Sequence, residues 1–194
     1  MRSARGMSLI EMLAVLAVMA TVAGIAAPMV VNALAYFRVS GDARGISNAV
    51  ALAKMRAAAD FSQVRLYVDL SARSHHLETW DKTGLQWTAE GGNSNLSSGV
   101  SFGYAGLASA PPNTQATIAQ APQCQTNAGG NIANTSCVIF NSRGIPVDST
   151  GSPTALDAFY VTDGSAIYGV TISATGMVKT WRANSQYSTA WVQQ

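Results

Sequence analysis

The first third of the chain divides into an uncharged apolar segment and an amphipathic one. Residues 12–31 contain no charged side chain, and a helix of that length spans about 30 Å, the thickness of the hydrocarbon core of a bilayer. Farther on, apolar side chains recur at the i, i+3, i+4, i+7 spacing of one helix face: Ile46, Ala49, Val50, Ala53 and Ala57. The pattern predicts one long helix over residues 7–60. Its half 7–36 is expected to cross a membrane and its half 37–60 to be amphipathic.

Two places could weaken this helix. Pro28 removes a backbone hydrogen bond and is expected to bend the helix or open it locally. The segment Gly41–Gly45 contains two glycines, which are poor helix formers. The sequence leaves open whether the helix breaks there.

The remaining residues, 61–194, show strand patterns separated by turn residues. Apolar and polar side chains alternate over residues 64–70, a turn is plausible at 71–74, and alternation resumes over 76–80, which predicts a hairpin. Further short strands are predicted at 85–87, 100–102, 137–140, 159–162, 168–172 and 177–181, with loops at 91–95 and 105–135 and a turn at 173–176. A long helix followed by hairpins predicts an α+β fold with antiparallel sheets and one β-rich domain.

Composition and charge narrow the class of protein. Charged residues make up 11% of the chain, against about 25% in ordinary soluble proteins. The surface is instead rich in small polar residues, which is common in extracytoplasmic β-rich domains. Arg2 and Arg5 precede the apolar segment and almost no basic residue directly follows it, which places the N-terminus in the cytoplasm. The formal net charge of +2 gives no sign of a nucleic-acid-binding domain.

The two cysteines, Cys124 and Cys137, lie in a polar loop region. The predicted topology puts them in an oxidising compartment. A bridge between them closes a loop of about 14 residues, which stabilises a fold by about 3 kcal/mol in the chain-entropy model. Two free thiols are the alternative, and no histidine or further cysteine lies nearby to make a metal site.

No pattern of catalytic or ligand-binding residues stands out. His75 and His76 are neighbours on a predicted strand, so they point to opposite faces and are expected to be two exposed polar side chains near a turn. Gly129-Gly130 lacks the apolar helix that follows a phosphate-binding loop. Three aspartates lack the spacing of a calcium loop: Asp148, Asp157 and Asp163. The sequence therefore predicts no enzyme, no cofactor and no metal.

The N-terminal motif combines a short basic leader, a glycine and an acid inside the apolar segment. The leader, residues 1–6, ends at Gly6, and Glu11 lies near the start of the apolar run. A carboxylate at the centre of a bilayer costs about 2.5–3.5 kcal/mol on insertion scales, so Glu11 requires a partner. Its expected partner is the positive α-amine that cleavage after Gly6 creates on Met7.

This motif resembles the class III signal of type IV prepilins and type II secretion pseudopilins. The resemblance implies that a prepilin peptidase and methyltransferase cuts between Gly6 and Met7 and methylates the new N-terminus, and that Glu11 is used in assembly. The residues that fit are Gly6, Ser8, Leu9, Ile10, Glu11 and Leu13. Met7 departs from the usual phenylalanine, and Pro28 lies where many pilins carry a helix proline.

Blocks farther along the chain resemble the GspH/FimT family of minor pseudopilins and minor pilins. The blocks are 55–59, Trp87, 96–102, 139–144 and 170–179. This resemblance implies a pilin-like fold, with the N-terminal helix packed on antiparallel β-sheets. It also implies a structural subunit of a type II secretion pseudopilus or a type IV pilus, whose partners are other pilin or pseudopilin subunits and the inner membrane. The sequence does not separate the two assemblies.

Other interpretations of the N-terminus stay open. A secretory signal peptide would be cut near residues 24–26 or 33–35, but a cleavable apolar region is normally about 7–15 residues long, shorter than this one. An uncleaved anchor of an unrelated periplasmic domain, including an enzyme, is a second alternative. Both have the same orientation, so the identity of the mature N-terminus distinguishes them from a prepilin.

A DNA-binding minor pilin of an uptake pilus is the alternative function. Basic and aromatic side chains suit phosphate contacts and base stacking, and Lys179, Trp181 and Arg182 cluster near the C-terminus, with Arg143 as a further contributor. Some FimT-like proteins bind DNA through a basic motif after a glycine that corresponds to Gly176. Here Met177 and Val178 follow that glycine, so an ordinary final strand with a half-buried tryptophan is favoured.

Overall fold

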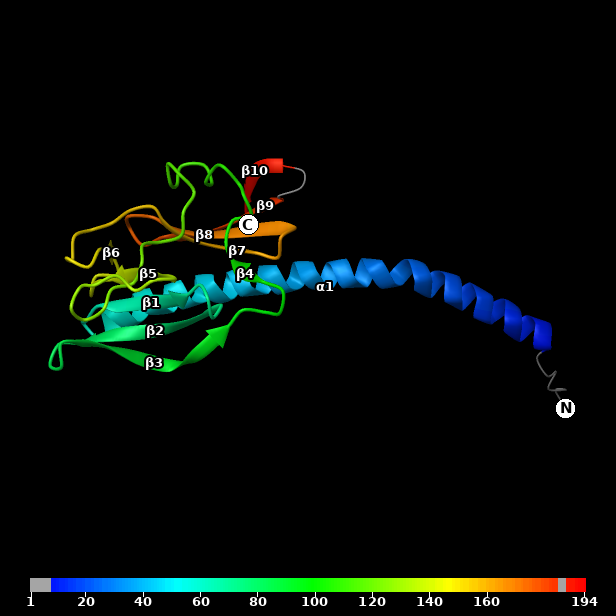
Figure 1. The fold of residues 1–194 in the computed structure, drawn as a ribbon, viewed down its shortest axis with the longest axis horizontal. Coiled ribbons are helices and arrows are strands. Elements are labelled where there is room, and N and C mark those ends of the chain that lie inside the picture. The colour runs from blue at the N-terminus through cyan, green and yellow to red at the C-terminus, as the bar shows by residue number, and fades with distance from the viewer. Residues whose placement is uncertain (1–7, 185–187) are drawn as a thin grey trace. The chain divides into compact units, whose positions relative to one another are not determined.

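The computed structural model describes residues 8–184 and 188–194, and within it the chain divides into two compact units (Figure 1). One unit comprises residues 1–37 and the other residues 38–194. The leader and the cleavage pair Gly6 and Met7 lie outside the described residues.

A single helix, α1 (Leu9–Ala59), confirms the long N-terminal helix. It is continuous through Pro28 and through Gly41–Gly45, so the proline does not open it and the glycine segment is not a break. The end lies close to the predicted one: the Asp60 amide donates to the Arg56 carbonyl oxygen at 2.9 Å, and Phe61 then takes a left-handed conformation with φ 48°. A left-handed residue after the last turn is a common way to end a helix.

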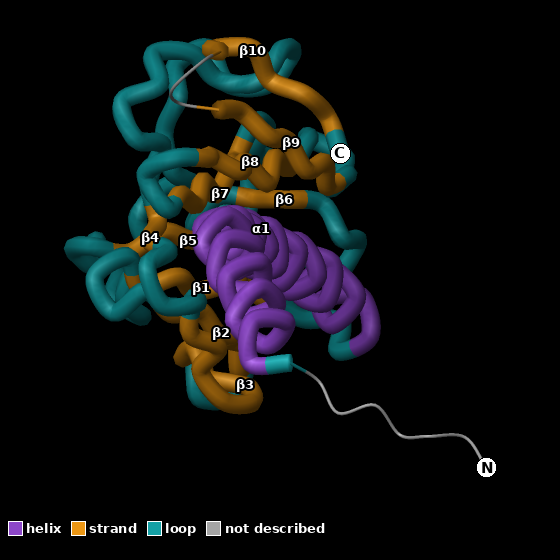
Figure 2. Tube along the Cα trace, turned by 90° about the vertical axis from the view of Figure 1, so that its right-hand side faces the viewer, coloured by secondary structure: helices purple, strands orange, loops and turns teal. Residues whose placement is uncertain are grey.

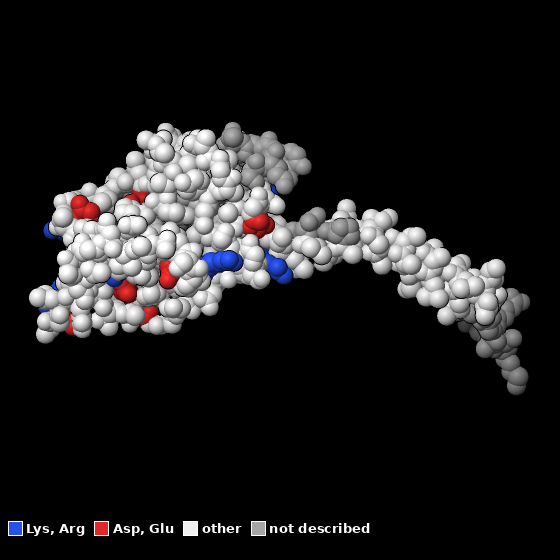
Figure 3. Space-filling model, in the orientation of Figure 1, with Lys and Arg blue, Asp and Glu red and all other residues white. Residues whose placement is uncertain are grey.

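The part of α1 in the first unit is apolar on all sides. Its large side chains are exposed, with Leu9 80% and Ile25 68% accessible, and its described residues show neither blue nor red on the face drawn in Figure 3. Among the described residues α1 is the one helix that is long and apolar enough to cross a membrane. Such a surface is unfavourable in water and favourable in lipid.

In the second unit, α1 buries one face against the strands. The fully buried positions follow steps of three and four residues: Val39, Ala43, Ile46, Val50, Ala53 and Ala57. This confirms the amphipathic half, although Ala49 lies at the edge of the buried face and not within it. Three of the six are alanines, and small side chains let the backbones of helix and sheet approach closely.

Two five-stranded sheets pack around this helix, and all their pairings are antiparallel. In both Figure 1 and Figure 2, the first three strands of the chain and the last three lie on different sides of α1. Sheet A has the order β3 (Gln86–Asn95), β2 (Ser74–Asp81), β1 (Val64–Asp69), β5 (Thr135–Phe140), β6 (Pro146–Val147). Sheet B has the order β10 (Ser188–Gln193), β9 (Val178–Asn184), β8 (Ala166–Ile172), β7 (Asp157–Thr162), β4 (Ser101–Phe102). The α+β prediction is confirmed.

The prediction of a loop over residues 91–95 is wrong. Residues 91–95 belong to β3, which pairs with β2 as far as Asn95. The pairing register shifts between His75 and Leu77, and Gly91 adopts φ 78°, a conformation that glycine reaches without steric cost. The glycines that suggested a loop therefore accommodate an irregularity within a long strand. The short β6 and the terminal β10 were not predicted.

Candidate functional site

Glu11 lies in the first turn of α1, where it caps its own helix. The amides of Glu11 and Met12 donate to the Ser8 carbonyl oxygen at 3.1 and 3.2 Å, and the Glu11 carboxylate accepts from the Ser8 amide at 3.4 Å. A serine followed three residues later by glutamate is the pattern of a capping box, a signal present in the sequence but missed there. A carboxylate is also favourable at the positive end of a helix dipole. Glu11 therefore has a partner within its own chain.

The two cysteines form a disulfide with Cα atoms 4.9 Å apart, and both are buried, with Cys124 1% and Cys137 7% exposed. The surrounding loop is held by backbone bonds: the Cys137 amide donates to the Pro122 carbonyl oxygen at 2.8 Å, and the Ile132 amide to the Cys124 carbonyl oxygen at 2.8 Å. The bridge thus ties the end of the long loop to β5.

We expect non-reducing peptide mapping of the protein, isolated from its native compartment, to recover Cys124 linked to Cys137. The oxidising compartment and the short loop both favour the bridge. Alkylation of both thiols in folded protein without prior reduction contradicts this prediction. A sample reduced in denaturant serves as the control for complete labelling.

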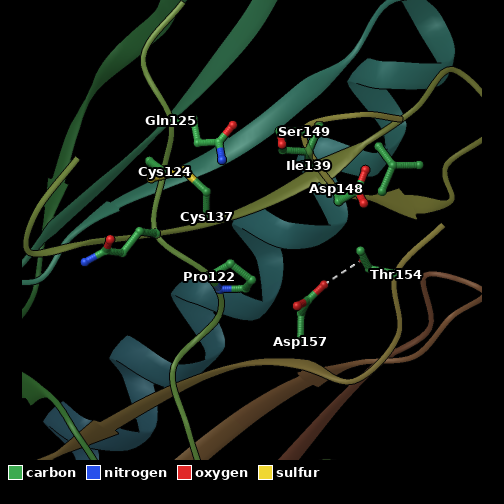
Figure 4. A pocket seen from close by; sticks show the side chains of 11 residues that line it. Pro122, Cys124, Gln125, Cys137, Ile139, Asp148, Ser149, Thr154 and Asp157 are labelled. Carbon is green, nitrogen blue, oxygen red and sulfur yellow. Dashed lines mark hydrogen bonds between the residues drawn. A yellow bond between two sulfur atoms is a disulfide. The ribbon is translucent and has the colours of Figure 1, made fainter. Parts of the chain in front are cut away.

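A cavity of about 170 Å³ lies beside the disulfide (Figure 4). Asp157 points into it and accepts a hydrogen bond from the Thr154 hydroxyl at 3.0 Å, and burial raises the pKa of the Asp157 carboxyl. Asp148, the second carboxylate, is engaged by the Thr150 hydroxyl and the amides of Thr150 and Ser152 at 2.7–3.0 Å. Within the described residues, no group of three or more His, Cys, Asp or Glu side chains could hold a metal.

The two histidines have different surroundings, and the expectation that both are exposed is wrong. His75 is 8% exposed, and burial lowers the pKa of its imidazole. His76 stacks on Tyr67 with ring centroids 4.9 Å apart, and its Nε2 lies 3.2 Å from the Glu78 carboxylate. The opposite orientation of neighbouring strand residues accounts for this difference.

The basic and aromatic residues near the C-terminus do not form one surface. Lys179 is exposed, while Trp181 is 8% exposed and its indole N–H donates to the Thr171 hydroxyl at 2.9 Å. Lys179 and Trp181 line a groove of about 210 Å³, whereas Arg182, the next residue on β9, points to the other face of the strand. Arg143 lies in the turn between β5 and β6. Trp181 is therefore more deeply buried than the half-buried side chain expected from the sequence. A buried indole is not available to stack on a base.

Residues 1–27 match a family model described as the prokaryotic N-terminal methylation motif. This match confirms the class III signal predicted from the sequence. No protein of curated function matches the chain.

Two solved structures, both of the minor pseudopilin EpsH from the type 2 secretion system of Vibrio cholerae, resemble this chain with TM-scores of 0.44. One is 11% identical and the alignment covers 74% of this chain and 95% of that one. The other is 14% identical, with 74% and 92% covered.

Proposed function

We propose that the chain is a minor pilin or pseudopilin, a structural subunit of a type II secretion pseudopilus or a type IV pilus. One observation carries the proposal: a prokaryotic methylation motif over residues 1–27 includes the start of a 51-residue helix, Leu9–Ala59. The first part of that helix exposes apolar side chains on all sides. A segment of this kind is held by lipid before assembly and by other apolar helices afterwards.

The proposed processing follows from the motif. A prepilin peptidase and methyltransferase cuts between Gly6 and Met7 and methylates Met7. Before assembly the subunit is a single-pass protein of the inner membrane, with its N-terminus in the cytoplasm and residues 61–194 in the periplasm. The buried Cys124–Cys137 disulfide supports this orientation, because disulfides persist in oxidising compartments.

Assembly rests on α1 in this proposal. Apolar contacts between helices supply cohesion, and Glu11 pairs with the methylated amine of Met7 on a neighbouring subunit to fix the register. Breaking a desolvated charge pair by removing one partner costs about 3–5 kcal/mol, so a misplaced subunit is rejected. The β-rich domain then contacts other subunits at the fibre surface. No observation favours the DNA-binding alternative, since Trp181 is buried and Arg182 lies on the other face of β9 from Lys179.

The Gly6→Val protein is expected to keep its leader, because a branched side chain at the cleavage site blocks the peptidase. Wild-type protein extracted from membranes should begin at N-methylated Met7. Mass analysis of the N-terminus identifies the first residue of both the variant and the wild type. Gly24→Val is the matched control. It makes the same change inside the apolar helix, where an added Cβ meets nothing within 4 Å, so cleavage should be normal. A wild-type N-terminus near Ala27 or Tyr36 would rule out the prepilin interpretation.

A further inference from the structure

A second cavity beside sheet A is lined by aromatic and neutral polar side chains. It measures about 140 Å³ and lies where the hairpin of β2 and β3 meets the disulfide loop. Its lining combines two indoles, a guanidinium and neutral polar groups, among them Gln63, Arg65, Trp80, Trp87, Asn127 and Ser149. The lining contains no carboxylate.

The two indoles form a fixed corner. Trp80 and Trp87 pair across β2 and β3, with ring centroids 5.2 Å apart and planes at 66°. The Arg65 guanidinium lies over Trp87 at 4.2 Å from the ring centroid. This cation–π contact holds the guanidinium and the Trp87 indole in place, so the aromatic surface is formed before any ligand arrives.

Two partners hold the Arg65 side chain in place, and one of them is a carboxylate that neutralises its charge. It is 3% exposed, its Nε pairs with the Glu78 carboxylate, and its Nη1 donates to the Gln125 carbonyl oxygen at 2.7 Å. A buried cation that already has a carboxylate partner offers little to an anion. The cavity is therefore suited to a neutral ligand that accepts hydrogen bonds from the remaining guanidinium N–H groups.

Several polar groups of the lining still have hydrogen-bonding capacity. Within the described residues, the side chains of Gln63 and Ser149 make no hydrogen bond, although both line the cavity. The side-chain oxygen Oδ1 of Asn127 accepts a hydrogen bond from the backbone amide of Trp87 at 3.1 Å. This bond orients the Asn127 side chain and leaves its two N–H donors for other partners. Neutral amides and hydroxyls bind the adjacent hydroxyl groups of a polyol well.

The cavity adjoins the one beside the disulfide. The two share Gln125, Ile139 and Ser149 as walls, and Figure 4 shows these three residues at the edge of the neighbouring cavity. Each holds about the volume of one sugar ring, at about 140 and 170 Å³. An extended ligand with repeating units suits this pair better than a single compact molecule.

We propose that these two cavities bind a neutral oligosaccharide. The C–H face of one pyranose ring packs on Trp80, because the Arg65 guanidinium already covers a face of Trp87. The hydroxyls of this ring bond to Gln63, Asn127 and Ser149. The next ring enters the cavity beside the disulfide. This proposal does not rest on the role of the chain in a fibre.

The test uses the full chain in a detergent without a sugar headgroup, titrated with a trisaccharide of glucose or of N-acetylglucosamine. A saturable change in tryptophan fluorescence below about 10 mM sugar is expected, the range of a weak site. Trp80→Ala should remove the change. Gln63→Ala and Ser149→Ala should each weaken binding about 3- to 10-fold, the effect of one lost hydrogen bond.

Gln86→Ala is the matched control, because Gln86 carries the same amide one residue before Trp87 but does not line the cavity. Its affinity should equal that of the wild type. No saturable change with either trisaccharide overturns the proposal, and so does binding that Gln63→Ala and Ser149→Ala leave intact. Gln63→Ala and Ser149→Ala remove no intramolecular hydrogen bond, so a folding defect does not confuse the result.

Co-sedimentation with insoluble cell-wall glycan distinguishes the source of the sugar. Sedimentation that the free trisaccharide competes away assigns the site to a polymeric glycan. Trisaccharide binding without sedimentation assigns it to a free oligosaccharide, and both outcomes support the site. Fibre assembly of Trp80→Ala should be normal, so failure of this proposal and failure of the proposed function give different results.

Discussion

The Glu11→Leu protein is expected to enter the membrane and to be cleaved, yet to be nearly absent from fibres. Leucine at this position removes a carboxylate that is unfavourable in lipid, so insertion should be at least as efficient as in the wild type. The peptidase acts at Gly6, so cleavage should be unaffected. The charge that pairs with the amine of a neighbouring subunit is lost, and with it the register of assembly.

Fractionation of a tagged protein between membranes and sheared fibres measures this effect. Glu11→Gln is the decisive comparison, because glutamine keeps an oxygen for the Ser8 amide but carries no charge. Failure of both variants assigns the effect to the charge. Normal assembly of Glu11→Gln beside failure of Glu11→Leu assigns the effect to the helix cap.

Glu11→Asp keeps the charge with a shorter reach and should assemble partially. Assembly of Glu11→Leu at the wild-type level would show that the acid does not determine assembly in this subunit, as at a fibre tip that lacks one neighbour.

The Gly176→Ala protein is expected to lose about 3–5 kcal/mol of folding free energy, from backbone strain and a backbone clash together. Gly176 ends the turn between β8 and β9 with φ 71°. A Cβ there would lie 2.5 Å from the Gly144 carbonyl oxygen, far inside contact distance. The turn has little freedom to move away, because Lys54 of α1 donates to the carbonyl oxygens of Gly176 and Thr175 at 3.0 and 3.3 Å.

Gly151→Ala separates the two causes. Gly151 has φ 85°, but an added Cβ meets nothing within 4 Å, so only the conformational cost of about 1–2 kcal/mol applies. Urea unfolding of the full chain in micelles, followed by tryptophan fluorescence, gives both values. Equal losses for the two variants would mean that the contact with Gly144 contributes nothing.

The helix was predictable because its signals are local and numerous. An uncharged run and a spacing of three and four residues persist over many turns, and the buried Val39 and Ala43 extend the predicted face in the same phase. Whether Gly41 and Gly45 break the helix was not predictable. Two glycines cost about 2 kcal/mol together, and that cost has to be weighed against burial of the opposite face on the sheets, which the sequence does not show.

The strands were predictable where apolar and polar residues alternate clearly along the sequence. They were not predictable where pairing with a neighbouring strand determines the conformation. Residues 91–95 carry turn-forming residues, but pairing with β2 holds them in a strand. Arg65 alternates with apolar neighbours and would be expected to face solvent. Instead Glu78 and Trp87 bury it, and both come from other strands.

The same distinction separates the two sites. The processing motif lies within a few consecutive residues, so the sequence contains all of it. The proposed saccharide cavity is formed by residues from Gln63 to Ser149, contributed by β1 and the residue before it, by β2, β3 and β5, and by the disulfide loop and the segment after β6. Neither Gln63 nor Ser149 belongs to any motif, and only the fold places them beside Trp80 and Trp87.

The hydrogen bond between Glu11 and Ser8 bears on how a subunit passes from lipid to fibre. In the membrane the carboxylate is held by the first turn of its own helix, and in the proposed fibre it is held by an amine of the neighbouring subunit. In this proposal, transfer exchanges one hydrogen-bond partner of the carboxylate for another, so the carboxylate has a partner before and after assembly. A subunit that meets no amine is then expected to return to the cap of its own helix. The first turn of α1 thus gives the assembly step reversibility until the correct neighbour is found.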